Sequence, residues 1–457
     1  MKQEEAFQLL KLGANVFLTG PAGSGKTFLL NKYISYLKEK NISAAVTAST
    51  GIAATHIGGI TIHSWCGMGI AKQLSKAEFK TVLNKRYLKN RMLKTKVLII
   101  DEISMLDADR LDLVNNICQS FKNSVAPFGG IQVIFCGDFF QLPPVNGREE
   151  NNEYAFKANV WNESCLSVCY LNEQHRHSDK KFIKVLNSIR NNKTDKDTLI
   201  TLKSRLNSPV CGNIAPTKLF TNNKDVNAIN DFELAKIKQS ETVYQMQSSY
   251  KKGRKQLVDF LMKNCMAPAR LVLKKGAVVM FVKNKFSESG FAHYVNGTLG
   301  KIIGFSEFDN YPIVETNDNR QIIACPREWT VEEGDEVVAK ISQVPLRLAW
   351  AITVHKSQGM SLDEMIVDLR DAFDYGMGYV ALSRVRALSG MELLGLNKMS
   401  LQVNPEIVEK DKEYIKQSEE DLKNLQKISK QEIQKRQKEY LKAMSGKEKN
   451  DLFDEVF

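Results

Sequence analysis

Long hydrophobic runs are missing from this sequence of 457 residues. No stretch approaches the ~20 apolar residues that a membrane-spanning helix requires, and Glu4 and Glu5 stand where a secretion signal would carry positive charge. The eight cysteines are scattered and include no C-x-x-C pair, which argues against a disulfide scaffold and a zinc site. We therefore expect a cytoplasmic protein, nucleoid-associated if bacterial, with reduced thiols and no membrane partner.

Acidic residues are fewer than basic ones. Lys and Arg total 64 against 52 Asp and Glu, which gives a formal net charge of +12 at pH 7. Excess positive charge favours a polyanionic partner such as nucleic acid, although an excess of +12 over 457 residues is also compatible with having no such partner. The proportions of hydrophobic residues (43%) and charged residues (25%) are ordinary for a folded chain of about three domains.

Short apolar runs alternate with helix-like stretches in two parts of the chain. This pattern predicts parallel sheets covered by helices on both faces. Between 276 and 345 the runs are separated by Gly, Asn and Asp, which predicts a small inserted β-barrel. Lys and Glu dominate from 403 onward, which predicts a solvated helical tail rather than a dedicated binding element. The apolar runs are 15–18, 43–47, 96–100 and 131–136 in the first part, and 217–221, 364–369 and 391–395 in the second.

A phosphate-binding loop follows the first apolar run. The segment from Gly20 to Thr27 reads GPAGSGKT, which matches G-x-x-x-x-G-K-[ST] between a strand and a helix. Backbone N–H groups of such a loop and the helix N-terminus bind phosphate oxygens. Lys26 neutralises phosphate charge and the Thr27 hydroxyl ligates Mg²⁺. The loop predicts ATP and Mg²⁺ as cofactors.

Two further motifs suit ATP hydrolysis. The run KVLIIDE ends in Asp101, a candidate Mg²⁺ ligand, and Glu102, placed to activate the attacking water. In GDFFQLPPV the side chain of Gln141 can hydrogen-bond the γ-phosphate. Phe139 and Phe140 in the same motif either stack on bases or pack in the core, and the sequence leaves both alternatives open.

The motifs together resemble those of the petite-integration-frequency family of superfamily-1B DNA helicases, with RecD-type helicases as near relatives. The resemblance rests on GPAGSGKT, STGIAATHIGGITIHSW, DEISM, APFGGIQVIFCGDFFQLPPV, AWAITVHKSQGMSLDE and YVALSRVRA, and it extends from about residue 3 to 396. It implies an α/β fold of two tandem RecA-like P-loop cores, with a small insertion in the first core, an SH3-like β-barrel in the second and a helical C-terminal tail. The implied boundaries are 1–63 and 92–175 for the first core, 64–91 for its strand-separating insertion, 176–275 and 346–402 for the second core, 276–345 for the barrel and 403–457 for the tail.

Several site residues are assigned through this resemblance. Gln3 matches the glutamine that reads adenine, and Arg176 and Arg384 match two arginines that reach the γ-phosphate from the second core. Arg386 is an alternative to Arg384, and Gly359 matches a backbone contact beside the same phosphate. The nucleotide-binding set is thus Gln3, Gly20, Gly23, Ser24, Gly25, Lys26, Thr27 and Gly359, and the catalytic set is Lys26, Glu102, Gln141, Arg176 and Arg384.

A DNA track is predicted across both cores. Hydroxyl, imidazole and ammonium groups at strand ends can contact phosphates without reading base sequence. The competing interpretation for His63 is that its side chain packs in the core. The competing interpretation for Lys356 is that its side chain is simply solvated. The predicted contacts are Thr47, Thr50 and His63 in the first core and Thr353, His355 and Lys356 in the second.

The function implied is that of an ATP-dependent DNA helicase. The family implies 5′→3′ movement on single-stranded DNA, unwinding of duplexes and of structures such as quadruplexes, and a role in replication, repair or telomere-type maintenance. The expected partners are single-stranded and forked DNA, with quadruplex DNA as a further candidate, and the expected state in solution is a monomer. The alternative is a DNA-binding ATPase clamp or remodeller without processive unwinding.

Overall fold

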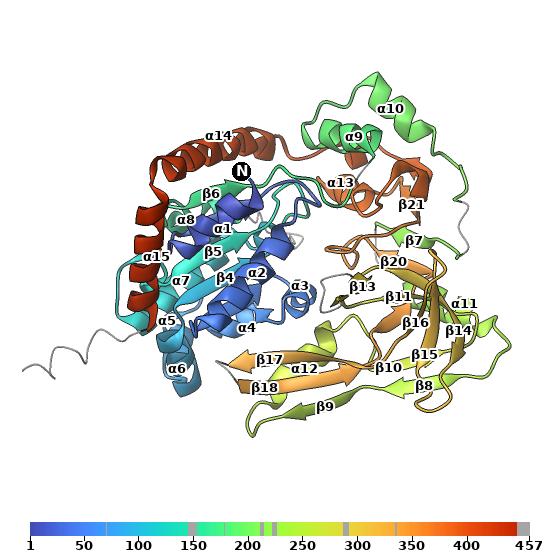
Figure 1. The fold of residues 1–457 in the computed structure, drawn as a ribbon, viewed down its shortest axis with the longest axis horizontal. Helices are drawn as coiled ribbons and strands as arrows, with labels where there is room; N and C mark the ends of the chain where they lie inside the picture. Colours follow the sequence, from blue (N-terminus) through green and yellow to red (C-terminus); the bar gives the residue numbers. More distant parts are fainter. Residues whose placement is uncertain are drawn as a thin grey trace, which may run out of the picture.

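Two α/β bodies lie side by side in the computed structural model of the chain (Figure 1). The first is core 1 and contains the phosphate-binding loop, and the second is core 2. A β-rich region adjoins core 2, and the C-terminal helices return to core 1. The structure describes residues 1–69, 71–144, 153–177, 179–210, 214–221, 226–286, 292–333 and 336–445.

Core 1 is built on a 6-stranded parallel sheet. Every residue of the first, fourth and fifth strands is buried, which is typical of central strands with helices on both faces. The sixth strand forms one edge. In spatial order the strands are β3 (Ile60–Thr61), β2 (Ala44–Ala48), β4 (Val97–Asp101), β5 (Gln132–Cys136), β1 (Val16–Thr19) and β6 (Ser167–Tyr170).

The predicted insertion at 64–91 is helical and packs on core 1. Trp65, Leu88 and Met92 belong to the buried cluster of this core, whereas Tyr87 is 43% exposed. The side chain of Glu78 caps one of these helices by accepting hydrogen bonds from Ser75. The helices of core 1 are α1 (Gln3–Lys11), α2 (Lys26–Glu39), α3 (Gly51–His56), α4 (Ile62–Cys66), α5 (Lys76–Leu83), α6 (Arg86–Lys94), α7 (Ala108–Lys122) and α8 (Asn159–Glu163).

Core 2 contains a 4-stranded parallel sheet. Its strands include the three predicted at 217–221, 364–369 and 391–395, so the second α/β series is confirmed. Both cores are RecA-like, as the resemblance implies. The strands in spatial order are β20 (Ala351–Thr353), β7 (Thr217–Phe220), β21 (Met365–Leu369) and β22 (Met391–Leu396), and the helices are α9 (Lys180–Arg190), α10 (Lys196–Lys203), α11 (Val226–Ala235) and α13 (Met377–Leu382).

The β-rich region begins earlier than residue 276. Strand β8 (Thr242–Gln245) pairs with β10 (Arg270–Leu273), and β9 (Gln247–Tyr250) pairs with β18 (Glu336–Gln343). All four residues of β9 are exposed, so no hydrophobic pattern marks it in the sequence. These pairings favour an earlier start for this domain, whose bounds stay a prediction. The other elements are α12 (Lys255–Asn264), β11 (Val278–Phe281), β12 (Lys285–Phe286), β13 (Ala292–Tyr294), β14 (Leu299–Phe305), β15 (Pro312–Thr316), β16 (Gln321–Ile323), β17 (Arg327–Glu333) and β19 (Leu346–Leu348).

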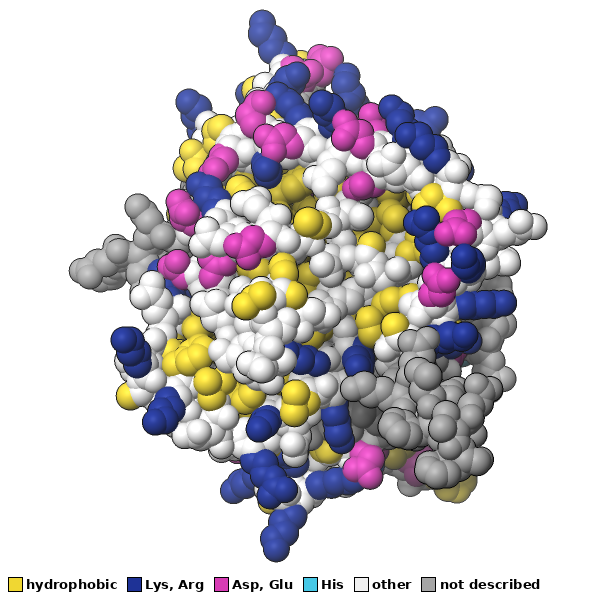
Figure 2. Space-filling view, turned by 90° about the vertical axis from the view of Figure 1, so that its left-hand side faces the viewer, with side chains coloured by type: hydrophobic (Ala, Val, Ile, Leu, Met, Phe, Trp, Pro, Cys, Tyr) yellow, Lys and Arg dark blue, Asp and Glu magenta, His cyan; other side chains and the backbone are white. Residues whose placement is uncertain are grey.

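The C-terminal tail is helical as predicted, but it is not wholly solvated. Helices α14 (Pro405–Lys427) and α15 (Lys430–Ser445) lie along core 1 (Figure 1). Ser418 and Asp421 on the inner face of α14 accept hydrogen bonds from backbone N–H groups of edge strand β6. In the face turned to the viewer in Figure 2, acidic and basic side chains are interspersed above, and basic ones predominate along the lower edge. The last part of the predicted tail, 446–457, lies outside the described residues.

None of the described helices has both the length and the apolar composition to cross a bilayer.

Candidate functional site

The loop from Gly20 to Gly25 joins β1 to α2, and its backbone has the conformation expected of a phosphate cradle. Gly23 and Gly25 have φ of +84° and +86°, a region that residues with a Cβ atom rarely adopt. A Cβ on Gly25 would also collide with the side-chain amide of Gln3. The structure thus brings Gln3 to the start of α2, where the helix N-terminus favours negative charge.

Two side chains of the loop are suited to hold a phosphate-bearing ligand. The Lys26 Nζ donates to the carbonyls of Gly20 at 2.7 Å and Pro21 at 3.1 Å. Burial lowers the pKa of Lys26, and the nearby Asp138 carboxylate opposes this shift. The buried Ser24 Oγ has no hydrogen-bond partner among the described residues. A buried hydroxyl in this position costs free energy unless a ligand bonds to it, so the loop fits the nucleotide that the sequence predicts.

Asp101 and Glu102 lie at the end of β4. Glu102 has a left-handed backbone (φ 51°, ψ 47°), and its N–H donates to Asp101 Oδ1 at 2.9 Å. Burial raises the pKa of Asp101. Burial and then the Asp101 charge raise the pKa of Glu102 to about 7. The exposed Thr27 hydroxyl and the Asp101 carboxylate are hard oxygen donors, the type that Mg²⁺ prefers.

Arg176 and Arg384 lie close together at the boundary between the cores. The Arg384 side chain is buried, with Nε donating to the Val380 carbonyl at 2.8 Å, and Arg176 donates to the Ser383 carbonyl at 3.1 Å. Burial lowers the pKa of Arg176 to about 9 and that of Arg384 to about 10, and Glu102 partly offsets the shift of both. A polyanionic ligand would stabilise the charged form of two such buried guanidinium groups.

The alternative arginine lies elsewhere. Arg386 is about half exposed and pairs with Asp363 at 3.4 Å. The structure therefore favours Arg384 over Arg386 as the arginine at the nucleotide cleft.

Gln358 is a site residue that the sequence interpretation missed. It comes from core 2, is 9% exposed, and its Nε2 donates to Glu102 Oε2 of core 1 at 3.1 Å. The next residue, Gly359, has φ of +77°. The signal was available, because an amide directly precedes the predicted phosphate contact in HKSQG.

The GDFFQ motif lies between the cores. Gln141 is 7% exposed, and the start of α13 packs so closely on its loop that a Cβ on Gly376 would collide with the Phe140 carbonyl. Phe139 and Phe140 are 4% and 2% exposed, and Phe139 packs edge-on against Phe156. Of the two alternatives for these aromatic residues, core packing is the one observed.

Two of the predicted DNA contacts need correction. The Thr47 side chain is fully buried and its hydroxyl donates to the Ile99 carbonyl. Thr353 is 4% exposed, and its hydroxyl accepts from the Lys356 N–H. Both lie near strand ends as expected, but their neighbours cover them, so the structure favours neither threonine as a DNA contact.

The other predicted DNA contacts have exposed surface. Thr50 caps α3 by accepting from the Ala53 N–H, and His63 is half-buried. Burial and then Arg110 lower the pKa of His63 to about 4, which keeps its imidazole neutral at pH 7. His355 is exposed and Lys356 half-buried, both beside Gln358. This set offers hydrogen bonds and one lysine charge along both cores.

The turn VNGTLG of the β-rich region lies against both cores. The Asn296 Nδ2 is 3.2 Å from His56 Nε2 of α3, and a Cβ on Gly297 would meet the backbone of Ser361. The turn therefore adjoins the loop that carries Gln358.

Comparisons with known proteins agree with this geometry. A family model described as PIF1-like helicase matches residues 2–199, and one described as DNA helicase Pif1, 2B domain, matches residues 256–305. A relative from Psychrobacter sp., named ATP-dependent DNA helicase Pif1, is 42% identical over 89% of this chain and 69% of its own length. One of the same name from Bdellovibrio bacteriovorus is 34% identical, over 89% and 90%. The chain spans 61% of the length of relatives from Emericella nidulans and Xenopus laevis.

Solved structures are similar along nearly their whole length. A Pif1 from Bacteroides sp. in complex with ADP-AlF4 has a TM-score of 0.76 and 30% identity, covering 91% of this chain and 96% of that one. A Bacteroides Pif1 helicase in complex with ADP-AlF3 and single-stranded DNA has a TM-score of 0.60 and 31% identity, covering 92% and 97%.

Proposed function

The chain belongs to the PIF1-like helicase family of ATP-dependent DNA helicases, and we propose that it moves 5′→3′ along single-stranded DNA and unwinds forked duplexes. The polarity rests on the resemblance to the family, and the observation that carries the coupling of ATP to DNA is the Gln358–Glu102 hydrogen bond. It connects the loop of core 2 that bears His355 and Lys356 to the carboxylate suited to activate water in core 1. DNA on that loop and ATP chemistry are thereby coupled.

The proposed hydrolytic roles rest on the positions of these residues and, for Gln3, on the resemblance to the family. Gln3 binds adenine, the glycine-rich loop and Lys26 bind the phosphates, and Thr27 and Asp101 would hold Mg²⁺. When bound, the metal neutralises charge on the phosphate oxygens. Glu102 orients and deprotonates the attacking water.

Groups from the boundary between the cores complete the site. Arg176 and Arg384 stabilise the charge that develops on the transferred phosphoryl group, while Gln141 and the Gly359 backbone contact the γ-phosphate. Because the phosphate loop and these arginines belong to different cores, closure of the cores is required for turnover. DNA that bridges the cores favours this closure.

The DNA contacts are proposed for Thr50, His63, His355 and Lys356. Solved Bacteroides Pif1 structures that contain single-stranded DNA support DNA binding in general, and these four side chains are the members of the predicted track that have exposed surface. Their residue types favour phosphate contacts, so binding should be salt-dependent and nearly independent of base sequence. We further propose that quadruplex DNA is a substrate, that the free protein is monomeric, and that it acts in the cytoplasm or on the nucleoid in replication or repair.

A strand-displacement assay tests this function. Duplexes with a 5′ single-stranded tail should be unwound in the presence of ATP and Mg²⁺, and those with a 3′ tail should not. Glu102→Gln should bind ATP and DNA but neither hydrolyse nor unwind, while Lys26→Ala should also bind ATP weakly. DNA-stimulated ATP hydrolysis without displacement of either tailed duplex would favour the alternative, a clamp or remodeller.

A further inference from the structure

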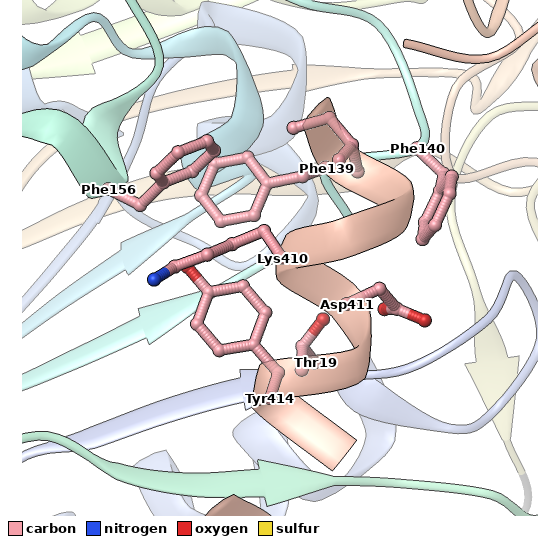
Figure 3. Close-up of a pocket in the computed structure, with 8 residues that line it drawn as sticks. Thr19, Phe139, Phe140, Phe156, Lys410, Asp411 and Tyr414 are labelled. Atoms are coloured by element: carbon pink, nitrogen blue, oxygen red, sulfur yellow. The ribbon is translucent and has the colours of Figure 1, made fainter. Parts of the chain in front are cut away.

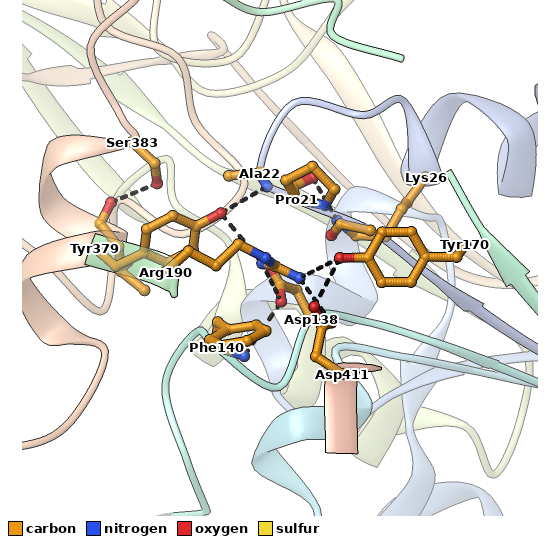
Figure 4. Close-up of polar contacts among 12 residues, drawn as sticks. Pro21, Ala22, Lys26, Asp138, Phe140, Tyr170, Arg190, Tyr379, Ser383 and Asp411 are labelled. Carbon is orange, nitrogen blue, oxygen red and sulfur yellow. Dashed lines mark hydrogen bonds and ion pairs between the residues drawn. The ribbon is translucent and has the colours of Figure 1, made fainter. Parts of the chain in front are cut away.

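Helix α14 contacts more than the surface of core 1. Its Asp411 Oδ2 accepts a hydrogen bond from the Tyr170 hydroxyl of β6 at 3.0 Å, and its Oδ1 lies 3.3 Å from Arg190 Nη2 of α9. Tyr170 belongs to core 1 and Arg190 to core 2. A carboxylate of the C-terminal helix therefore lies where the two cores meet (Figure 4).

Arg190 is the centre of this cluster. Its side chain is 5% exposed, its Nη1 forms hydrogen bonds of 2.8 and 2.7 Å to both oxygens of the fully buried Asp138, and its Nη2 donates to the Tyr170 hydroxyl at 3.2 Å. The guanidinium also stacks over the Phe140 ring at 3.9 Å. A buried guanidinium keeps a fixed position only while its hydrogen-bond partners are in place.

The cluster reaches the nucleotide site through Tyr379. The Tyr379 hydroxyl of α13 accepts hydrogen bonds from Arg190 Nη1 at 3.3 Å and from the Ala22 N–H of the phosphate loop at 3.0 Å. Arg384 is the second residue after α13 and donates to the Val380 carbonyl within that helix. One set of contacts thus runs from Asp411 through Arg190 to the helix that holds Arg384.

The packing beside Asp411 leaves little freedom. Tyr414, Ile407 and Asp411 of α14 line a cavity of about 10 Å³ with Phe139, Phe140 and Phe156 of core 1. Figure 3 shows Phe139, Phe156 and Tyr414 on one side of the helix, and Phe140 and Asp411 on the other. A cavity of this size holds about one water. The helix is therefore docked tightly enough to hold the Asp411 carboxylate in place.

We propose that α14 contributes to the coupling of ATP hydrolysis to DNA binding, with Asp411 as a positioning residue. Together with Tyr170, Asp411 holds Arg190 in place. Through Tyr379, this arrangement sets how Arg384 approaches the phosphate loop. The inference rests on the proposed function and adds the C-terminal helix to it. The hydrogen-bond partners of Asp411 are Tyr170 and Arg190, neither of which is proposed to bind nucleotide or DNA, so the effect of Asp411 is on the coupling between the two ligands.

The test compares Asp411→Asn with Glu419→Gln, which removes the same charge from an exposed position of α14. Full-length proteins are assayed for ATP hydrolysis with and without a single-stranded oligonucleotide and for urea unfolding. The expected result for Asp411→Asn is a fall of about 5-fold or more, typical of a coupling free energy, in the ratio of DNA-stimulated to basal kcat. Glu419→Gln should keep the wild-type ratio, and Asp411→Glu should recover part of it.

Other results would decide against the inference. A wild-type ratio in Asp411→Asn, with or without a lower urea midpoint, would overturn it, because α14 would then only stabilise the fold. Should Asp411→Asn fail to fold, Tyr170→Phe removes one hydroxyl from the same cluster and must lower the ratio for the inference to hold. A wild-type protein without DNA stimulation would instead contradict the proposed function itself.

Discussion

The side-chain amide of Gln358 donates to the Glu102 carboxylate at 3.1 Å, and the two residues are 256 positions apart in the chain. Glu102 is the carboxylate at the end of β4, and Gln358 lies on the loop after β20. The bond joins a carboxylate of core 1 to the loop of core 2 that bears His355 and Lys356. Because its two ends belong to different cores, a relative movement of the cores would alter it.

Replacing Gln358 by Ala should lower DNA-stimulated kcat by about 10- to 150-fold, since a hydrogen bond to a charged group is worth about 1.5–3 kcal/mol. Affinity for ATP and for single-stranded DNA should change little, because the loop and the DNA-facing side chains stay in place. Steady-state ATPase assays with saturating oligonucleotide and equilibrium binding would measure both. An unchanged stimulated kcat would show that the bond has no role in coupling.

Arg384 and Arg386 form a matched pair for substitution by Lys. Arg384→Lys should reduce kcat by about 10³-fold, because a lysine cannot reproduce the planar guanidinium at a transferring phosphate. Arg386→Lys should stay near wild type, since its contact with Asp363 is half exposed. Single-turnover hydrolysis compares the two. A greater loss at Arg386 would reverse their assignment.

Lys356→Ala should weaken binding to single-stranded DNA and flatten its salt dependence. Each neutralised phosphate contributes a slope of about −0.7 to log K against log[salt], so the change should be somewhat under one unit. Thr47→Val, at a buried position, should leave the slope unaltered. Fluorescence anisotropy over a range of salt concentrations measures this. A Lys356→Ala slope equal to wild type would remove Lys356 from the DNA track.

The buried His177 should make stability fall in mild acid. Burial lowers its folded pKa to about 4 from the ordinary 6.5. Between these values the unfolded chain binds a proton that the folded chain does not, so the free energy of unfolding decreases as pH falls from 6.5 towards 4, by up to about 3 kcal/mol. Urea titrations of wild type and His177→Gln should differ in this pH range. Parallel pH profiles would contradict a buried neutral His177.

Local patterns predicted the fold well where one segment carries the whole signal. The buried strands β4 and β5 are continuous apolar runs, and the phosphate loop has glycines at the positions where its backbone requires a positive φ. The failures are contacts between distant segments. Thr47 looked like a DNA contact because its hydroxyl is polar, yet its acceptor is Ile99 on the adjacent strand. No local pattern shows that Asp411 meets Arg190.

The inner face of α14 illustrates the same limit. Its contacts with β6 are polar, through Ser418 and Asp421, and its buried apolar residues are only Ile407, Tyr414 and Leu425 over 23 residues, so its apolar stripe is narrower than that from which a docked helix is usually recognised. Side chains that satisfy an exposed strand edge resemble surface residues in the sequence. The sequence of a helix that docks in this way therefore predicts, wrongly, that the helix is surrounded by solvent.

The return of α14 to core 1 also limits how the two bodies can move. The chain passes from core 1 to core 2 between β6 and α9, and passes back between β22 and α14. Two bodies that are joined at two points rotate most easily about the line through those points. Opening and closing of the two cores are then described by a single angle of rotation about this line. A single pair of fluorescent probes, one on α2 of core 1 and one on α11 of core 2, would report this angle.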